Sequence, residues 1–507
     1  MVGLGYVGWI ALVVIICFVC FKIWWSRRRL RELASLIQGP ETVPVLGNVH
    51  QFFGGPRKAA NYLRELLAEY QGRAFRIWFG PLLYVCITAP EDVELLLANQ
   101  RLLNRDRYLM RILSRFLGNG LTTCASDTWR KQRKMVNPAF HTKVVESYME
   151  VFNKQAKVLS QKLKSFADGN VFDAYRLVGL CTFDMICEST LGVTLNAQDY
   201  RDAQFILRTV HKMMHLLFKR AVRPWLIFDG LYNLTEMGKE QKKGETLLRA
   251  LGDIVIFIKM EAYRAMKSSK AMYEEWEKKK STFMDHMIST AESEGTTLTE
   301  KQLRDEVNTI MMAGQETTAS NLCFIFMLLG MFPKHQDEIY QELKEVFDDD
   351  WDRPVTPQDL KQFKYLDRFI KEAMRVVPVV TLIPREVEEE VKLSTCTLPA
   401  GCVAVVGTYV VHRDPRFFPD PERFDPERFL PERSKGRHPY SYIPFGAGPR
   451  MCVGFKYAEM QMATTVATVL KSYRVLPTTS YESLLQELEL GLVVRPAKGF
   501  QVKMVPR

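Results

Sequence analysis

The sequence predicts a mainly α-helical fold with small β-sheets, preceded by one N-terminal transmembrane helix. Residues 2–21 carry no charged side chain. Most of the remaining chain places apolar residues at the 3.6-residue spacing of amphipathic helices, while strand-like runs are few and short. With 507 residues, 47% of them hydrophobic and 25% charged, the composition is that of a folded protein with a large core.

The first segment, residues 1–25, is predicted to be an uncleaved signal anchor. Its apolar stretch has about the 20 residues needed to cross a bilayer. Two tryptophans and then four arginines between 27 and 31 follow it. By the positive-inside rule this order places the rest of the chain in the cytosol. We therefore expect a basic linker at 26–38 and one large cytosolic domain at 39–507.

The body of the chain is predicted to contain long helices and few strands. Helical periodicity covers 57–71, 91–116, 127–168, 172–191, 200–218, 236–268, 300–331, 334–347, 357–377 and 454–473. Strand-like runs lie near 73–88, near 389–406 and in two short stretches close to the C-terminus.

Charge and cysteine content narrow the function classes. The formal net charge of +11 suits an anionic membrane surface, an acidic protein partner or nucleic acid. We expect no nucleic acid partner, because the sequence has no zinc-finger spacing, RNA-binding signature or basic zipper. The ten cysteines are scattered irregularly, which indicates free thiols in a reducing compartment rather than a disulfide scaffold.

One cysteine, Cys452, stands among glycines and prolines directly before the predicted helix at 454–473. A helix N-terminus presents unpaired N–H groups and positive charge, which favour a thiolate. The glycines let the backbone approach a large flat ligand, and Arg450 can bind a carboxylate through two hydrogen bonds. Together these features indicate haem iron held by Cys452.

This segment resembles the cysteine-ligand signature of the cytochrome P450 family, F-x-x-G-x-R-x-C-x-G. All of its fixed positions are present, namely Phe445, Gly448, Arg450, Cys452 and Gly454. The rows RHPYSYIPFGAGPRMCVG (437–454) and FDMICESTLGVTLNAQ (183–198) are similar to the fatty-acid ω-hydroxylase clan, in particular to insect-like members. The resemblance spans residues 39–507 and implies the cytochrome P450 fold, with a haem-thiolate catalytic domain that binds haem b.

The resemblance also assigns residues to the cofactor. Trp129 and Arg133, which share a helix face at i and i+4, and Arg385 are expected to bind the haem propionates with Arg450. The implied cofactor-binding residues are Trp129, Arg133, Ala313, Arg385, Phe445, Arg450 and Gly454, with Cys452 as the metal ligand. Glu372, Arg375 and Arg428 are expected to form a buried triad behind the haem.

The opposite side of the haem is assigned to the predicted helix at 300–331, where AGQETT resembles the family's A/G-G-x-D/E-T motif. Thr317 is expected to orient dioxygen and Glu316 to help relay protons. Ala313 and Gly314 are expected to leave space for the flat cofactor. Ala313 stands where the clan often has a glutamate esterified to the haem, so we predict non-covalent haem. Gln315 stands where histidine is frequent, which leaves the position of attack on the substrate open.

The implied function is an NADPH- and O2-dependent monooxygenase that hydroxylates lipophilic substrates of the fatty-acid-like, terpenoid, hormone or xenobiotic kind. Electrons would come from NADPH-cytochrome P450 reductase, with cytochrome b5 as an optional second donor, on the endoplasmic reticulum (microsomal) membrane. The predicted docking face consists of Arg130, Lys131, Lys134, Arg433, Lys435 and Lys456. The predicted substrate pocket consists of 115–122, 205–215, Met311, Met312, 379–382 and 491–493.

Two other functions stay open at the level of sequence. A haem-thiolate isomerase or dehydratase would need no reductase, and a haem-binding sensor or carrier would perform no catalysis. The pairing of Glu316 with Thr317 favours the monooxygenase, because neither alternative requires dioxygen activation.

Overall fold

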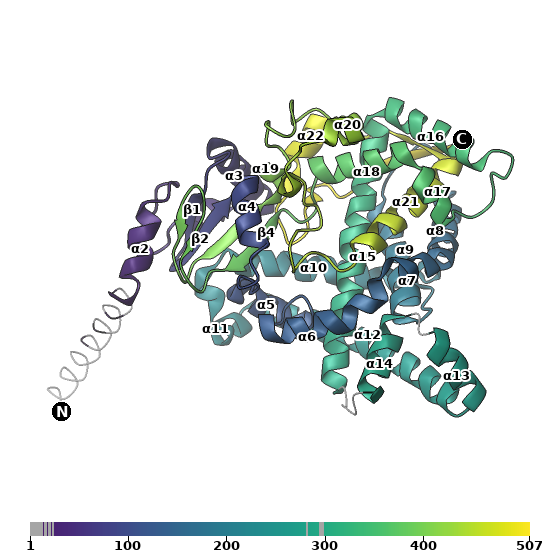
Figure 1. Ribbon diagram of the computed structural model, residues 1–507, viewed down its shortest axis with the longest axis horizontal. Helices are drawn as coiled ribbons and strands as arrows, with labels where there is room; N and C mark the ends of the chain where they lie inside the picture. Colours follow the sequence, from purple (N-terminus) through teal and green to yellow (C-terminus); the bar gives the residue numbers. More distant parts are fainter. Residues whose placement is uncertain (1–13, 15–17, 19–21, 23–24, 280–281, 294–298) are drawn as a thin grey trace.

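The computed structural model describes residues 14, 18, 22, 25–279, 282–293 and 299–507 of the chain. Most of the described chain is helical. A four-stranded sheet lies beside α2 near the N-terminal end of the molecule, and α15 runs through the middle of the helical part (Figure 1). The mainly helical fold with small sheets that the sequence predicts is confirmed.

The α-helices are α2 (Arg28–Ser35), α3 (Pro56–Glu69), α4 (Pro90–Leu97), α5 (Arg107–Leu117), α6 (Ser126–Val136), α7 (Thr142–Ser147), α8 (Met149–Leu163), α9 (Tyr175–Ile186), α10 (Gln204–Ala221), α11 (Asp229–Leu234), α12 (Glu236–Lys267), α13 (Lys270–Lys279), α14 (Phe283–Ser293), α15 (Glu300–Met331), α16 (Pro333–Phe347), α17 (Pro357–Gln362), α18 (Lys364–Val376), α19 (Thr408–Val411), α20 (Pro431–Ser434), α21 (Phe455–Ser472) and α22 (Tyr481–Gln486).

The strands are β1 (Phe75–Phe79), β2 (Leu82–Ile87), β3 (Val171–Asp173), β4 (Leu382–Glu386), β5 (Val391–Lys392), β6 (Thr397–Leu398), β7 (Val403–Gly407), β8 (Tyr473–Leu476), β9 (Leu488–Glu489), β10 (Arg495–Pro496) and β11 (Gln501–Pro506). The largest sheet has the order β1-β2-β7-β4, with β2 and β7 parallel and the other pairs antiparallel. A three-stranded sheet has the order β3-β11-β8, and β5-β6 and β9-β10 form two-stranded pairs.

Helix α15 begins and ends where its periodicity predicts. Its N-terminus carries a capping box, in which the Thr299 hydroxyl accepts from the Gln302 N–H and the Gln302 side chain accepts from the Thr299 N–H. Side chains are buried on most of its circumference from Val307 to Gly330. The helix therefore forms the centre of the hydrophobic core, and its few open positions face a cavity.

Several predicted helices were too long. The run at 91–116 is divided into α4 and α5, because the Asp106 carboxylate caps α5 by accepting from the N–H groups of Tyr108 and Leu109. The run at 127–168 is divided near Pro138, which lies in a short 3₁₀ turn between α6 and α7. Strand β4 was missed, because its central residue is Pro384. A proline is tolerated there since β4 lies at the edge of its sheet.

The predicted membrane anchor lies almost wholly outside the described residues. In the part of the chain that the structure describes, no helix is both long enough and apolar enough to cross a bilayer. The basic segment after it contains α2, in which Leu30, Leu33 and Ala34 are buried. Arg29 of this helix pairs with Glu390 at 2.9 Å.

The predicted triad is present behind the core. Arg375 donates from Nε and Nη2 to the two carboxylate oxygens of Glu372 at 2.7 and 2.8 Å, and both side chains are fully buried. Arg428 Nε lies 3.6 Å from Glu372 Oε1. Arg375 also donates to the carbonyls of His412 and Pro421, so the triad holds the long C-terminal loop against α18.

Candidate functional site

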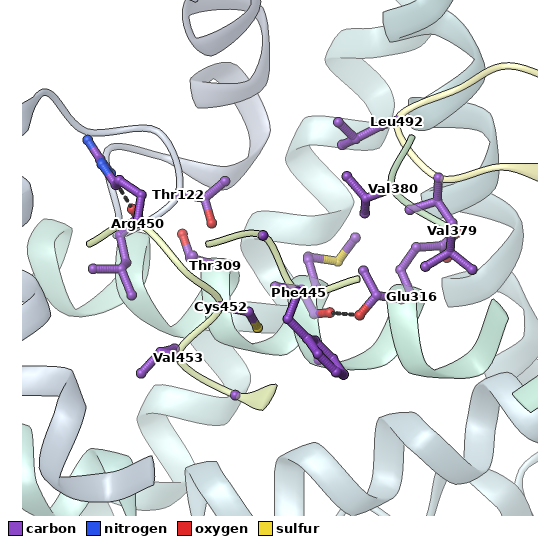
Figure 2. A pocket seen from close by; sticks show the side chains of 18 of the residues that line it. Thr122, Thr309, Glu316, Val379, Val380, Phe445, Arg450, Cys452, Val453 and Leu492 are labelled. Carbon is purple, nitrogen blue, oxygen red and sulfur yellow. Dashed lines mark hydrogen bonds between the residues drawn. The ribbon is translucent and has the colours of Figure 1, made fainter. Parts of the chain in front are cut away.

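A cavity of about 370 Å³ lies between α15, β4 and the loop that precedes α21. Cys452 is open to this cavity and is the cysteine among its lining residues. Figure 2 shows Cys452 close to Phe445, with Val379, Val380 and Leu492 grouped toward one side and Arg450 toward the other. The cavity thus has an apolar region and a cationic region, with the thiol between them.

The loop before α21 fixes the position of the thiol. The Cys452 N–H donates to the Phe445 carbonyl at 2.9 Å, and Gly454 is the N-cap of α21. Burial raises the pKa of the Cys452 thiol, although the Gly454 N–H and the guanidinium groups of Arg133 and Arg105 lower it. The helix start thus favours a thiolate as expected, but burial has the larger effect on the free thiol. Coordination to iron would remove the proton, as metals do from thiol ligands.

Two glycines have a packing role that the sequence did not predict. A Cβ on Gly448, which has a φ of +69°, would collide with the Leu97 carbonyl. A Cβ on Gly314 would lie 2.6 Å from Ile186 Cδ1, so Gly314 permits close packing of α15 against α9. Both glycines permit close packing within the protein, and Gly314 lines the cavity together with Ala313, as predicted.

Four arginines converge on the cationic region from separate elements. Arg450 donates from Nε to Leu103 O at 3.0 Å, from Nη1 to Leu121 O at 3.3 Å and from Nη2 to Cys124 O at 3.1 Å. Its guanidinium carbon lies 4.4 Å from the ring centroid of Trp129. The other three donate to single carbonyls, Arg105 to Thr122, Arg133 to Met451 and Arg385 to Pro384, at 3.0, 2.8 and 2.9 Å respectively.

These cations have no carboxylate partner among the described residues. The Arg385 Nε is buried without a hydrogen-bond partner in that part of the chain. Burial and the neighbouring guanidinium groups lower the pKa values of Arg385 and Arg450 to about 9. Burying cations without a counter-charge costs several kcal/mol each. The residues therefore fit a ligand that carries carboxylates, which is the chemistry of the two haem propionates.

The structure brings every predicted catalytic, cofactor-binding and iron-ligating residue to this one cavity. Its lining includes Trp129, Arg133, Ala313, Glu316, Thr317, Arg385, Phe445, Arg450, Cys452 and Gly454. Arg105 also lines it and was missed by sequence reasoning. It precedes the N-cap of α5, and no local pattern separates it from its neighbours Arg101 and Arg107.

The predicted acid and hydroxyl lie on adjacent residues of α15. The Thr317 hydroxyl donates to the Ala313 carbonyl at 2.8 Å, which leaves its lone pairs free to accept a hydrogen bond. Glu316 is 3% exposed and accepts from Arg495 Nη2 at 2.6 Å and from the Tyr175 hydroxyl. The proton-relay candidate is thus one member of a buried ion pair, a contact that the sequence did not indicate.

The predicted substrate pocket is present in part. Met312, Val379, Val380, Leu382, Leu492 and Val493 line the cavity, together with Leu109, Met110, Leu113, Leu117, Leu121 and Met214. Met311 is instead fully buried in the core, on another face of α15. Of the predicted segment at 205–215 only Met214 lines the cavity, because most apolar side chains of α10 pack into the core.

Comparison with known proteins agrees with this geometry. The family model for cytochrome P450 matches residues 37–504. Cytochrome P450 4V2 of Mus musculus is 35% identical over 500 residues, covering 95% of this chain and 91% of the relative. Cytochrome P450 4V2 of Homo sapiens is 33% identical over 484 residues, with 95% and 91% coverage. Cytochrome P450 4c3 of Drosophila melanogaster is 32% identical over 507 residues, with 96% and 92% coverage.

The resemblance that the cysteine segment indicates is thereby confirmed, including its likeness to a clan with insect members. Family membership implies haem iron with a cysteine thiolate as axial ligand, a redox partner, O2 and a lipophilic substrate. The chain belongs to the cytochrome P450 family and is a haem-thiolate monooxygenase.

Proposed function

We propose that this protein is an NADPH- and O2-dependent monooxygenase that hydroxylates lipophilic substrates, with Cys452 as the ligand of the haem iron. One observation carries the proposal. A single cavity holds a thiol at a helix start, an acid–threonine pair and four arginines. Two of these arginines are buried and two are partly buried, and none has a carboxylate partner among the described residues.

Each group in the cavity has a distinct task. When bound, the haem supplies oxygen activation, which electron donation from the cysteine thiolate assists. Arg105, Arg133, Arg385 and Arg450 would hold the haem through its propionates. Thr317 presents a hydroxyl that accepts and donates hydrogen bonds at the cavity wall, and Glu316 holds a carboxylate directly next to it on α15.

The substrate is inferred from the wall opposite the cations. Val379, Val380, Leu382 and Leu492 present only apolar side chains to the cavity, together with the methionines of α5, α10 and α15. An apolar molecule gains free energy on entering such a site because apolar surface leaves water. Fatty-acid-like, terpenoid, hormone and xenobiotic molecules all satisfy this chemistry.

The location of the enzyme is part of the proposal. We infer a signal anchor at 1–25, a basic linker at 26–38 and the catalytic domain at 39–507, on the cytosolic side of the endoplasmic reticulum membrane. The uncharged stretch at 2–21 and the arginines after it support this assignment. Mild alkaline extraction of microsomes tests it, since an anchored protein stays in the pellet and a peripheral protein is released.

NADPH-cytochrome P450 reductase is the proposed electron donor, with cytochrome b5 as an optional second donor. Arg130, Lys131 and Lys134 are exposed on α6, whose Arg133 contacts the cysteine loop. Lys131→Glu should raise the KM for the reductase several-fold without changing the haem spectrum, because the docking face loses a cation. The exposed Lys392 of β5 offers a matched control, and an equal effect of Lys392→Glu would argue against a specific docking face.

The proposed function is tested with the full-length protein and a reconstituted reductase. We expect a reduced carbon monoxide difference band typical of a thiolate-ligated haem, and substrate-dependent NADPH consumption across a panel of fatty acids, terpenoids and xenobiotics. Turnover that does not require O2, or no turnover with any of these substrates, would contradict the proposal. Cys452→Ser should abolish the thiolate band.

Thr317→Ala tests whether the Thr317 hydroxyl directs oxygen chemistry toward product. Without the hydroxyl, more of the NADPH consumed should end as hydrogen peroxide and less as hydroxylated product, because the proton no longer arrives in position. The measurement is the ratio of product to NADPH consumed. Thr318→Ala, on the next residue of the helix, is the control, and an unchanged ratio in Thr317→Ala would remove Thr317 from the proposed role.

A further inference from the structure

A buried carboxyl on α15 takes no part in the chemistry assigned above. Glu306 is 1% exposed and lies on the N-terminal half of the helix. Its Oε2 accepts from the Leu121 N–H at 3.1 Å, and its Oε1 is buried without a hydrogen-bond partner among the described residues. Burial raises the pKa of Glu306 to about 7. Burying a carboxyl with one oxygen unpaired lowers the stability of the fold, which indicates that Glu306 has a role outside packing.

The loop that Glu306 contacts is held tightly against α15. A Cβ on Gly118 would collide with the Asp305 carboxylate, and one on Gly120 would collide with the Thr309 hydroxyl. The Thr123 hydroxyl donates to the Gly118 carbonyl at 2.6 Å and closes the loop on itself. The loop therefore has little freedom to move relative to the helix.

The other side of the same loop holds Arg450. Leu121 donates its N–H to Glu306, and its carbonyl accepts from Arg450 Nη1 at 3.3 Å. Cys124, three residues later, accepts Arg450 Nη2 at 3.1 Å. Figure 2 shows Arg450 with its hydrogen bond at the edge of the cavity, near Thr122. One residue of the loop thus contacts both a buried acid and a buried cation of the haem site.

An ionised carboxylate accepts a hydrogen bond more strongly than a neutral carboxyl does. A negative charge on Glu306 therefore holds Leu121 more firmly in the place where its carbonyl accepts from Arg450. We propose that Glu306 is a positioning residue for Arg450, acting through the position of Leu121 and fixing Arg450 toward a haem propionate when the Glu306 carboxyl is ionised. This inference rests on the proposed haem site.

Among the groups around Leu121 and Arg450, Glu306 is the one expected to change its charge near neutral pH. On its own helix, Asp305 disfavours ionisation of Glu306. On the loop, burial raises the pKa of Cys124 to about 11, so this thiol stays neutral. Charged groups on the neighbouring helices α5 and α12 are paired elsewhere, Arg115 with Glu245 and Arg304 of α15 with Asp253, and Arg105 donates to the Thr122 carbonyl.

The test follows the release of haem from the full-length, haem-loaded protein to an excess of apomyoglobin. In the wild type, release should slow several-fold between about pH 6 and pH 8, on either side of the Glu306 pKa. Glu306→Gln keeps an oxygen for the Leu121 N–H but carries no charge. It should therefore release haem at the wild-type low-pH rate at both pH values. The ratio of the release rate at about pH 6 to that at about pH 8, called the pH ratio below, should fall toward one.

Glu342→Gln is the matched control. Glu342 likewise accepts from the backbone, from the N–H groups of Tyr365 and Leu366 at 2.6 and 3.0 Å. Burial raises its pKa too, but it lies on α16. The Glu342 variant should keep the wild-type ratio. An unchanged ratio in Glu306→Gln, or loss of the ratio in both variants, would overturn the inference.

The failure of this inference and that of the proposed function are distinguishable. A wild-type protein without a thiolate-type carbon monoxide band would remove the haem-thiolate site and the inference with it. A normal band in wild type and in Glu306→Gln, with equal pH ratios, would remove only the role of Glu306. Glu306→Ala, which also leaves the Leu121 N–H unpaired, should release haem faster than Glu306→Gln at both pH values.

Discussion

Arg385 shows how a single residue can be unfavourable for the fold and favourable for the cofactor. It is 2% exposed, and burial lowers its pKa to about 9 because no carboxylate lies nearby among the described residues. Its position is fixed by β4, where it pairs with Ala404 of β7. The unpaired charge lowers the stability of the fold, and only the binding of an anion compensates for this loss.

Replacing this cation should separate the two effects. Arg385→Met should leave the haem-free protein as stable as the wild type or more stable by about 1–4 kcal/mol, since a buried unpaired charge is removed. Haem binding should weaken about tenfold or more, because a charge-assisted hydrogen bond is lost. Thermal unfolding with and without haem, together with haem titration, measures both quantities.

Arg413 provides the control for that substitution. It is equally buried but donates to Glu422 at 2.8 Å, so Arg413→Met should destabilise the protein whether or not haem is bound. Equal destabilisation of the haem-free and haem-loaded forms by Arg385→Met would contradict the assignment of Arg385 to the cofactor.

Ala313 determines how the haem is attached. Its methyl group faces the cavity and has no carboxylate to form an ester with the cofactor. We expect acidified organic solvent to extract all of the haem, and mass spectrometry of the denatured chain to give the mass of the polypeptide alone. Haem that stays with the chain after extraction would show a second covalent attachment beside the iron–sulfur bond.

At the scale of elements, α15 is tied to the C-terminal strands by a buried ion pair. Arg495 of β10 donates from Nη2 and Nε to Glu316 Oε1 at 2.6 and 3.2 Å, and its guanidinium carbon lies 4.0 Å from the Tyr175 ring centroid. Burial lowers the pKa of Arg495, but Glu316 and Tyr175 raise it further, so the arginine stays charged. The pair fixes the Glu316 carboxylate in one direction beside the cavity.

Breaking this pair should be costly. Arg495→Leu leaves a buried carboxylate unpaired and should lower the free energy of unfolding by about 3–5 kcal/mol, measured by urea titration. The double variant Arg495→Leu, Glu316→Leu removes both charges and should recover much of that loss. If the double variant is as unstable as the sum of the single ones, the two side chains do not interact as the structure shows.

At the scale of the whole molecule, acid stability depends on a buried histidine near the triad. His412 is fully buried, and its Nε2 accepts from the Ile443 N–H at 2.9 Å. Burial, with Arg375 and Arg413, lowers the pKa of His412 from 6.5 to about 3. Between these values the unfolded chain binds a proton that the folded protein does not, so stability falls as the pH falls below 6.5.

The expected loss from this group is about 2 kcal/mol on going from neutral pH to about pH 5. His412→Gln keeps an acceptor for the Ile443 N–H and cannot bind the proton, so its stability should change less steeply over that range. Urea unfolding at a series of pH values gives the two slopes. Identical slopes in the wild type and the variant would show that His412 is not the group responsible.

Sequence alone determined the features that depend on neighbours along the chain. The ends of α15 follow from its periodicity and capping box, and the segment around Cys452 follows from its glycines, Arg450 and the helix that begins after it. The predicted catalytic, cofactor-binding and iron-ligating residues all line one cavity. Local patterns carry this information because helix formation, capping and the cysteine loop involve residues only a few positions apart.

Only the tertiary structure decided which distant residues meet. Arg105 joins the cation cluster from a loop, Gly448 packs against the Leu97 carbonyl, and Arg495 reaches Glu316 from 179 positions away. No local sequence pattern predicts these contacts, because the residues that meet lie far apart in the chain. The burial that makes the arginines ready for an anion, and Glu306 ready to titrate near neutral pH, exists only once elements from the whole chain have packed around them.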